Sequence, residues 1–101
     1  MAKTATTSRA RSSIKIANPI QIVVLDRGYV YVGRVRRDSN FVHITNARNV
    51  RRWGTSKGLG ELVRGPLSPT VLDPAGTVHA PLRALIALID VEQEPWAKIC
   101  I

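Results

Sequence analysis

Three short runs rich in β-branched and aromatic residues constrain the fold most. They cover residues 20–25, 29–35 and 41–45, and turn-forming residues separate them, first Asp26-Arg27-Gly28 and then residues 36–40. Runs of this kind, bounded by Gly, Asn and Asp, are typical of strands. Because the connections are short, we predict that the three strands form an antiparallel meander.

The middle of the chain gives weaker signals. A short strand is predicted over residues 49–53, and a short helix over residues 59–64, which Gly65-Pro66 ends. Prolines and a glycine interrupt the next stretch, so we expect turns there, with two short extended pieces at residues 71–72 and 77–78.

The apolar stretch near the end of the chain is predicted to close the sheet. Its spacing fits a helix as well as a buried strand, and we favour a short turn at residues 82–84 followed by a strand over residues 85–91. Residues 92–96 are expected to end the domain. The predicted fold class is mainly β, a small α+β domain: an antiparallel β meander or a small barrel-like sheet with one short helix around 59–64 and a C-terminal strand.

Composition divides the chain into two parts. Residues 1–18 are rich in Ala, Thr, Ser and basic residues and cannot bury enough apolar surface to form a core, so we predict a flexible basic arm. Residues 19–101 are predicted to form a single β-rich domain. No apolar run is long enough for a membrane span, and the start lacks the pattern of a secretory signal, so we expect no membrane partner and a cytoplasmic location.

Charge is the unusual feature of the composition. The chain has 15 Lys and Arg against 7 Asp and Glu, a net charge of +8. Residues 1–64 carry 13 of the basic residues and 3 of the acidic ones, whereas residues 65–101 are net acidic. The basic part predicts an anion-binding face, although scattered surface arginines are also often only solvated.

Signatures of catalysis and metal binding are missing from the sequence. The single cysteine, Cys100, allows no internal disulfide and no cysteine zinc site and is interpreted as a free terminal thiol. His43 and His79 belong to no cluster with metal-ligand spacing and are interpreted as ordinary strand residues. We therefore expect a protein that is not an enzyme, with no cofactor and no metal.

The sharpest candidate site combines arginines with a tryptophan. Guanidinium groups bind phosphates, and an indole provides a surface on which a base can stack. A turn that leads into a helix adds backbone N–H groups for a phosphate. The alternative is that Trp53 belongs to the core and that the arginines are solvated or paired with Glu61 and Asp38. The predicted ligand-binding residues are Arg48, Arg51, Arg52, Trp53, Ser56, Lys57 and Gly58.

Two runs in this region carry a resemblance. Asn46-Ala47-Arg48-Asn49-Val50-Arg51-Arg52-Trp53-Gly54 and the following Gly58-Leu59-Gly60-Glu61-Leu62 resemble a family of small phage-encoded proteins known as a domain of unknown function. The likeness covers roughly residues 20–91. A fainter similarity runs to the Thoeris anti-defence sponges of phages, small β-rich oligomers that sequester cyclic nucleotide signals. It implies a small anionic nucleotide ligand bound between subunits of a homo-oligomer.

Three hypotheses follow for the function. The first is a non-enzymatic phage protein that binds and sequesters an anionic nucleotide. The second is a nucleic-acid-binding accessory protein with a basic arm, and the third is a structural component of a virion or other assembly. For the second hypothesis the predicted contact residues are Lys3, Arg9, Arg11, Lys15, Arg34, Arg36 and Arg37.

Overall fold

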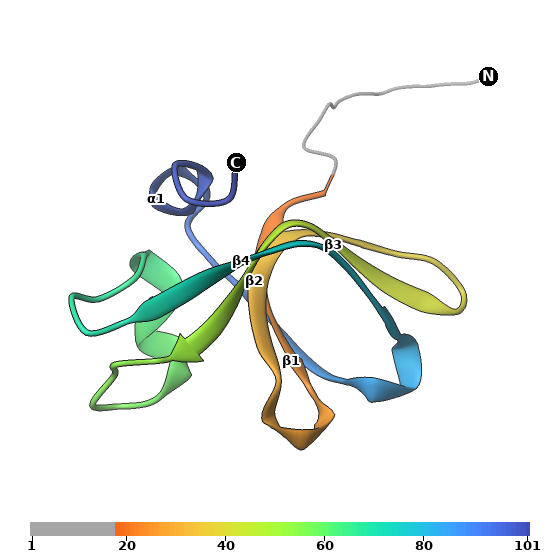
Figure 1. Cartoon of the computed structure of the whole chain (residues 1–101), viewed down its shortest axis with the longest axis horizontal. Coiled ribbons are helices and arrows are strands. Elements are labelled where there is room, and N and C mark those ends of the chain that lie inside the picture. The colour runs from red at the N-terminus through yellow and green to blue at the C-terminus, as the bar shows by residue number, and fades with distance from the viewer. Residues whose placement is uncertain (1–17) are drawn as a thin grey trace.

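A five-stranded antiparallel sheet with strand order β4-β3-β2-β1-β5 forms the body of the protein (Figure 1). The structure is a computed structural model and describes residues 18–101, so the predicted arm lies almost wholly outside the described residues. The strands are β1 (Ile20–Leu25), β2 (Val30–Arg37), β3 (Phe41–Arg52), β4 (Val71–Pro81) and β5 (Leu85–Asp90). The helical elements are the 3-10 turns η1 (Asp26–Gly28), η2 (Leu59–Arg64) and η3 (Leu82–Ala84) and the α-helix α1 (Gln93–Ala97).

The predicted meander and its closing strand are confirmed. β1 and β2 form a hairpin in which Arg27 (φ 62°) and Gly28 (φ 81°) take the left-handed conformation that the tight turn requires. The fifth strand returns after the predicted turn, which is η3, and pairs with β1, so that Ile22 lies opposite Ile89. The fold class predicted from the sequence, a mainly β domain, is therefore correct.

The strand predicted over residues 49–53 is confirmed as far as Arg52, but it is not a separate strand, because β3 runs without a break from Phe41 to Arg52. The strand continues through an irregular pairing with β4 between Ile44 and Ala47, where Asn46 has φ 51°. Bulges bend a strand without ending it. The polar residues that indicated a turn are therefore the bend of one long strand.

The extended pieces predicted at residues 71–72 and 77–78 are confirmed, but the turn predicted between them is wrong. β4 is a single strand that includes both Pro74 and Gly76. Pro74 is tolerated because β4 lies at the edge of the sheet, where a missing backbone donor breaks no pair on the open side. Gly76 (φ 69°) accommodates the irregular pairing opposite Ala47.

The C-terminal residues complete the core rather than end the domain. The α1 helix holds Trp96, which is fully buried and whose Nε1 donates a hydrogen bond to the carbonyl oxygen of Leu62 over 2.8 Å. Gln93 fixes the start of the helix, because its side chain accepts from the backbone N–H of Ile20 and donates to the carbonyl oxygen of the same residue. Cys100 is a free thiol but is buried beside this helix, and burial raises its pKa.

Both faces of the sheet are buried over part of their area, which explains the continuous apolar character of β1. Alternate residues of β1 enter two separate hydrophobic clusters. Ile20 and Ile22 face the outer cluster, which η2 and α1 cover, whereas Val23 and Leu25 face the inner cluster, formed where the sheet curls and η3 packs against it. The covering elements reach only part of the outer face, and the remaining part carries the polar groups described next.

Candidate functional site

The part of the outer face that η2 and α1 do not cover holds a cross-strand row of basic and aromatic side chains. Arg36 of β2 lies opposite His43 of β3, and His43 lies opposite His79 of β4. Cross-strand partners share a face of the sheet, with Cβ atoms about 5 Å apart. Phe41 belongs to the same face two residues before His43, and its side chain is 43% exposed. Arg34 extends this surface along β2, and we call these five residues the outer patch.

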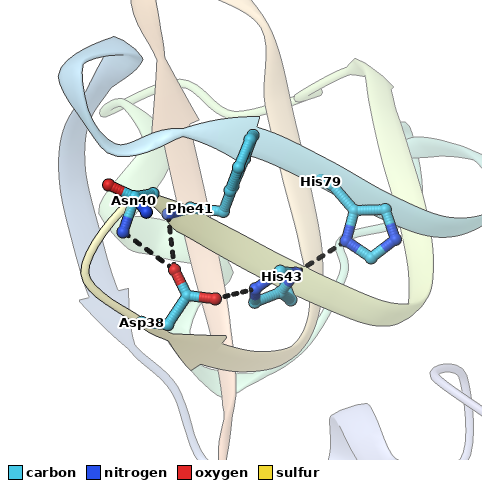
Figure 2. A network of polar contacts seen from close by, with 5 residues as sticks. All are labelled: Asp38, Asn40, Phe41, His43 and His79. Carbon is cyan, nitrogen blue, oxygen red and sulfur yellow. Dashed lines mark hydrogen bonds and ion pairs between the residues drawn. The ribbon is translucent and has the colours of Figure 1, made fainter.

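A chain of hydrogen bonds links the two histidines of the outer patch to a carboxylate. Asp38, in the turn between β2 and β3, accepts the backbone N–H groups of Asn40 and Phe41 at Oδ1, over 2.9 and 2.7 Å. Its Oδ2 lies 2.7 Å from Nε2 of His43. Nδ1 of His43 lies 2.6 Å from Nδ1 of His79, so His43 bridges the other two groups (Figure 2).

Asp38 is held in its ionised form by these contacts. The hydrogen bond from His43, followed by those from Asn40 and Phe41, holds the pKa of Asp38 far below its usual range. An ionised carboxylate has no proton to donate, so the proton on the Asp38–His43 hydrogen bond belongs to Nε2 of His43. A neutral His43 consequently presents the lone pair of Nδ1 to His79.

Because the pKa of Asp38 is lowered in the folded protein, we expect Asp38 to make the stability of the fold depend on pH in acid. The folded-state pKa is below the unfolded value of about 4, so the contribution of Asp38 is fully present above about pH 4 and is lost as the pH falls further. We expect the difference in melting temperature between the wild type and Asp38→Asn to shrink from about pH 4 to about pH 2. Thermal unfolding followed by circular dichroism measures this, with Asp26→Asn in the η1 turn as control. A difference in melting temperature between wild type and Asp38→Asn that grows as the pH falls would contradict this prediction.

The predicted ligand-binding arginines do not converge. Arg48 is half-buried, and its Nε donates to the carbonyl oxygen of Ile99, which anchors the C-terminal segment. Arg51 is exposed and forms an ion pair with Asp73 of β4, with Nε 2.6 Å from Oδ2. That hydrogen bond is the main reason why the pKa of Arg51 is raised. The two side chains leave β3 on opposite faces, because Arg48 lies on the face of the outer cluster and Arg51 on the other.

The turn that was predicted to donate N–H groups to a phosphate already holds an anion of the chain itself. Glu61 of η2 accepts the backbone N–H of Ser56 over 2.8 Å and that of Lys57 over 3.3 Å through Oε1. Gly58, with φ 101°, supplies the turn into η2. The anion-binding geometry of this turn is therefore present, but an internal carboxylate occupies it.

The core alternative for Trp53 is wrong, because its side chain is 41% exposed. Its backbone is held in place, since Oγ1 of Thr70 donates to the carbonyl oxygen of Trp53 over 2.6 Å. The next residue, Gly54, has φ 69° and packs so closely on Pro69 that no side chain fits there. Arg52 beside it is exposed, and no carboxylate among residues 18–101 forms a salt bridge with it. Arg52 and Trp53 are thus both exposed at the end of β3.

The second set of predicted contact residues is distributed differently. Arg34 and Arg36 belong to the outer patch, and neither forms a salt bridge within the described part of the chain. Arg37 lies on the other face and lines a hollow of about 490 Å³ together with Asp38 and Leu82. The four basic residues of the arm, Lys3, Arg9, Arg11 and Lys15, lie outside the described residues.

Sequence reasoning missed His43, His79 and Asp38 as a group. The histidines are 36 residues apart, and only the pairing of β3 with β4 makes them neighbours. No family model matches the chain, and a search of curated proteins gives no significant match. Within residues 18–101 no helix is both long enough and apolar enough to cross a membrane.

Proposed function

We propose that this protein binds single-stranded nucleic acid through the outer patch. The observation that carries the proposal is the outer patch, where the exposed Arg36 lies near the exposed ring of Phe41 and the half-buried Arg34 follows further along β2. Neither arginine has a carboxylate partner in residues 18–101. Arginines neutralise the phosphates of a strand, and an exposed ring stacks on its bases whatever the sequence. Two histidines in the same row add hydrogen-bonding groups.

The place where the described chain begins supports the same proposal. The described chain begins beside the outer patch, because Ile20 pairs with Arg34 and the backbone N–H of Val35 donates to the carbonyl oxygen of Pro19 over 3.0 Å. The described part of the chain therefore begins next to Arg34, and the sequence that precedes it contains four basic residues. Their combined attraction for phosphate raises the affinity for a polyanion more than for a single anion.

Binding of a fluorescein-labelled oligothymidylate, followed by fluorescence polarisation at several salt concentrations, tests this proposal. We expect the affinity to fall steeply with salt, because each bound phosphate releases counterions. Arg36→Ala should reduce the slope of log K against log salt by about 1, and Phe41→Ala should weaken binding by about 1–3 kcal/mol, because one base loses its stacking partner. Both side chains are exposed, so the fold should survive.

Arg64→Ala is the matched control, because Arg64 is exposed on η2 and pairs with Glu92. It should leave both the affinity and the salt slope nearly unchanged. Affinity that is insensitive to salt, or equal losses in Arg36→Ala and Arg64→Ala, would show that the outer patch is not the binding surface.

A second candidate function is the sequestration of a small anionic nucleotide, and the exposed side chains of Arg52 and Trp53 favour it. The indole offers a stacking surface and the guanidinium a phosphate-binding group, both at the end of β3. The other predicted members of this site are in part engaged, since Arg48, Arg51 and Ser56 already hold partners within the chain. Subunits of a homo-oligomer would have to complete such a pocket.

Calorimetry with a panel of cyclic nucleotides distinguishes the two candidates. Sequestration requires tight binding of at least one nucleotide and its loss in Arg52→Ala, with the ligand recovered intact. In the nucleic-acid proposal, Arg52→Ala leaves oligothymidylate binding nearly unchanged, and the cyclic nucleotides bind weakly.

A further inference from the structure

We propose that His43 and His79 form a binding site for a transition-metal ion of the Zn²⁺ type, with Nδ1 of each ring as ligands. The two residues are directly opposite each other on β3 and β4. Their Nδ1 atoms face one another at 2.6 Å, and the rings meet edge to face with centroids 4.9 Å apart (Figure 2). Two ring nitrogens that face one another in this way can both bind the same metal ion.

The carboxylate of Asp38 prepares His43 for this role. A histidine that binds a metal through one nitrogen commonly donates the proton of the other nitrogen to a carboxylate, which fixes the tautomer and the orientation of the ring. Here Nε2 of His43 lies 2.7 Å from Oδ2 of Asp38, and Oδ1 is fixed by two backbone N–H groups. In the neutral form of His43 the lone pair is therefore on Nδ1, directed at His79.

Little movement is needed to admit the ion. In a tetrahedral site with Zn–N bonds of 2.0–2.1 Å, two ligand nitrogens lie about 3.4 Å apart. The rings must therefore separate by less than about 1 Å, during which the ion replaces the proton shared between the two Nδ1 atoms. His79 can make this movement, because it is exposed and lies on an edge strand, whereas His43 is held by Asp38.

The donor atoms determine the class of metal. Imidazole nitrogens suit Zn²⁺, Cu²⁺ and Ni²⁺, whereas Mg²⁺ and Ca²⁺ prefer oxygen. Asp38 lies on the far side of His43 and does not reach the ion, and no group of three or more ligating side chains is found in residues 18–101. Arg36, the other neighbour of His43 in the row, adds a positive charge that lowers the affinity. The ion would keep open positions for water or for an anionic ligand.

Titration of the whole protein with zinc chloride in a calorimeter tests this site without any nucleic acid, so the result is independent of the proposed function. We expect one ion per chain. His79→Ala should lower the affinity at least tenfold. Asp38→Asn should lower it by about 10- to 100-fold, since a neutral amide oxygen is a weaker acceptor for the Nε2–H of His43 than a carboxylate. Asp73→Asn, which removes a carboxylate of β4 outside the row, should leave zinc binding unchanged.

A second readout uses the fact that the chain has two histidines and that Cys100 is buried. In a proton NMR spectrum, zinc should shift the ring resonances of both histidines together, at the same stoichiometry as the calorimetric titration. The site is disproved if zinc produces no heat and no shift, if His79→Ala binds as tightly as the wild type, or if one ion is bound per two chains.

Discussion

Replacing Trp96 by alanine will lower the free energy of unfolding by about 3–5 kcal/mol, the range for a large buried aromatic side chain. Trp96 is fully buried in the outer cluster, and its Nε1 is bonded to the carbonyl oxygen of Leu62. It therefore joins α1 to η2 and, through the cluster, to β1. A loss of this size is a large part of the stability of a small domain, about 5–15 kcal/mol.

Chemical denaturation followed by circular dichroism measures the effect, and the second tryptophan provides the matched control. Trp53 is 41% exposed, so Trp53→Ala should cost no more than about 1 kcal/mol. Trp96→Phe keeps most of the apolar volume but leaves the carbonyl oxygen of Leu62 without its donor, and should cost about 1–3 kcal/mol. Equal losses in the two alanine variants would contradict the position of Trp96 in the core.

Gly33→Ala is expected to destabilise the protein by about 1–3 kcal/mol, although it adds a single methyl group. A Cβ atom at Gly33 would lie 2.7 Å from Cγ2 of Ile44, 2.9 Å from the carbonyl oxygen of Thr45 and 3.1 Å from Cα of Ala47. Two of these three atoms belong to the backbone of β3, at the irregular pairing of β2 with β3. The strands must move apart to admit the methyl group, which disturbs the row from Arg36 to His79.

Gly60→Ala is the control for this substitution, since nothing lies within 4 Å of the position of its Cβ atom. It should change the free energy of unfolding by no more than about 0.5 kcal/mol. Gly33→Val should lower the free energy of unfolding more than Gly33→Ala, because the branched side chain of valine needs still more space. If Gly33→Ala left the free energy of unfolding unchanged, β2 and β3 would be less closely packed at this point than the structure shows.

Local patterns in the sequence were sufficient for most of the sheet. The runs of β-branched residues predicted β1, β2 and the start of β3, and the apolar run over residues 85–91 predicted β5. Each of these strands is bounded by turn residues close to it in the chain. The prediction failed where a strand contained residues that usually interrupt one, as at Asn46 in β3 and at Pro74 in β4. In those places pairing with a neighbouring strand outweighed local preference.

The candidate site was less accessible to sequence reasoning. The prediction assumed that neighbours in sequence act together, but successive residues of a strand point to opposite faces, so Arg48 and Arg51 separate. It also left open whether charged residues pair within the chain. In the structure Asp73 holds Arg51, and Glu61 occupies the N–H groups of Ser56 and Lys57.

The sequence by itself determined the class of fold, the excess of positive charge and the order in which the strands follow one another, because these depend on composition and on residues close in the chain. Only the tertiary structure decided which side chains meet. Asp38, His43 and His79 form one network because β3 pairs with β4 in a particular register. That register depends on the bulges near Asn46 and on contacts between distant residues, and a shift of one residue would place His79 on the other face.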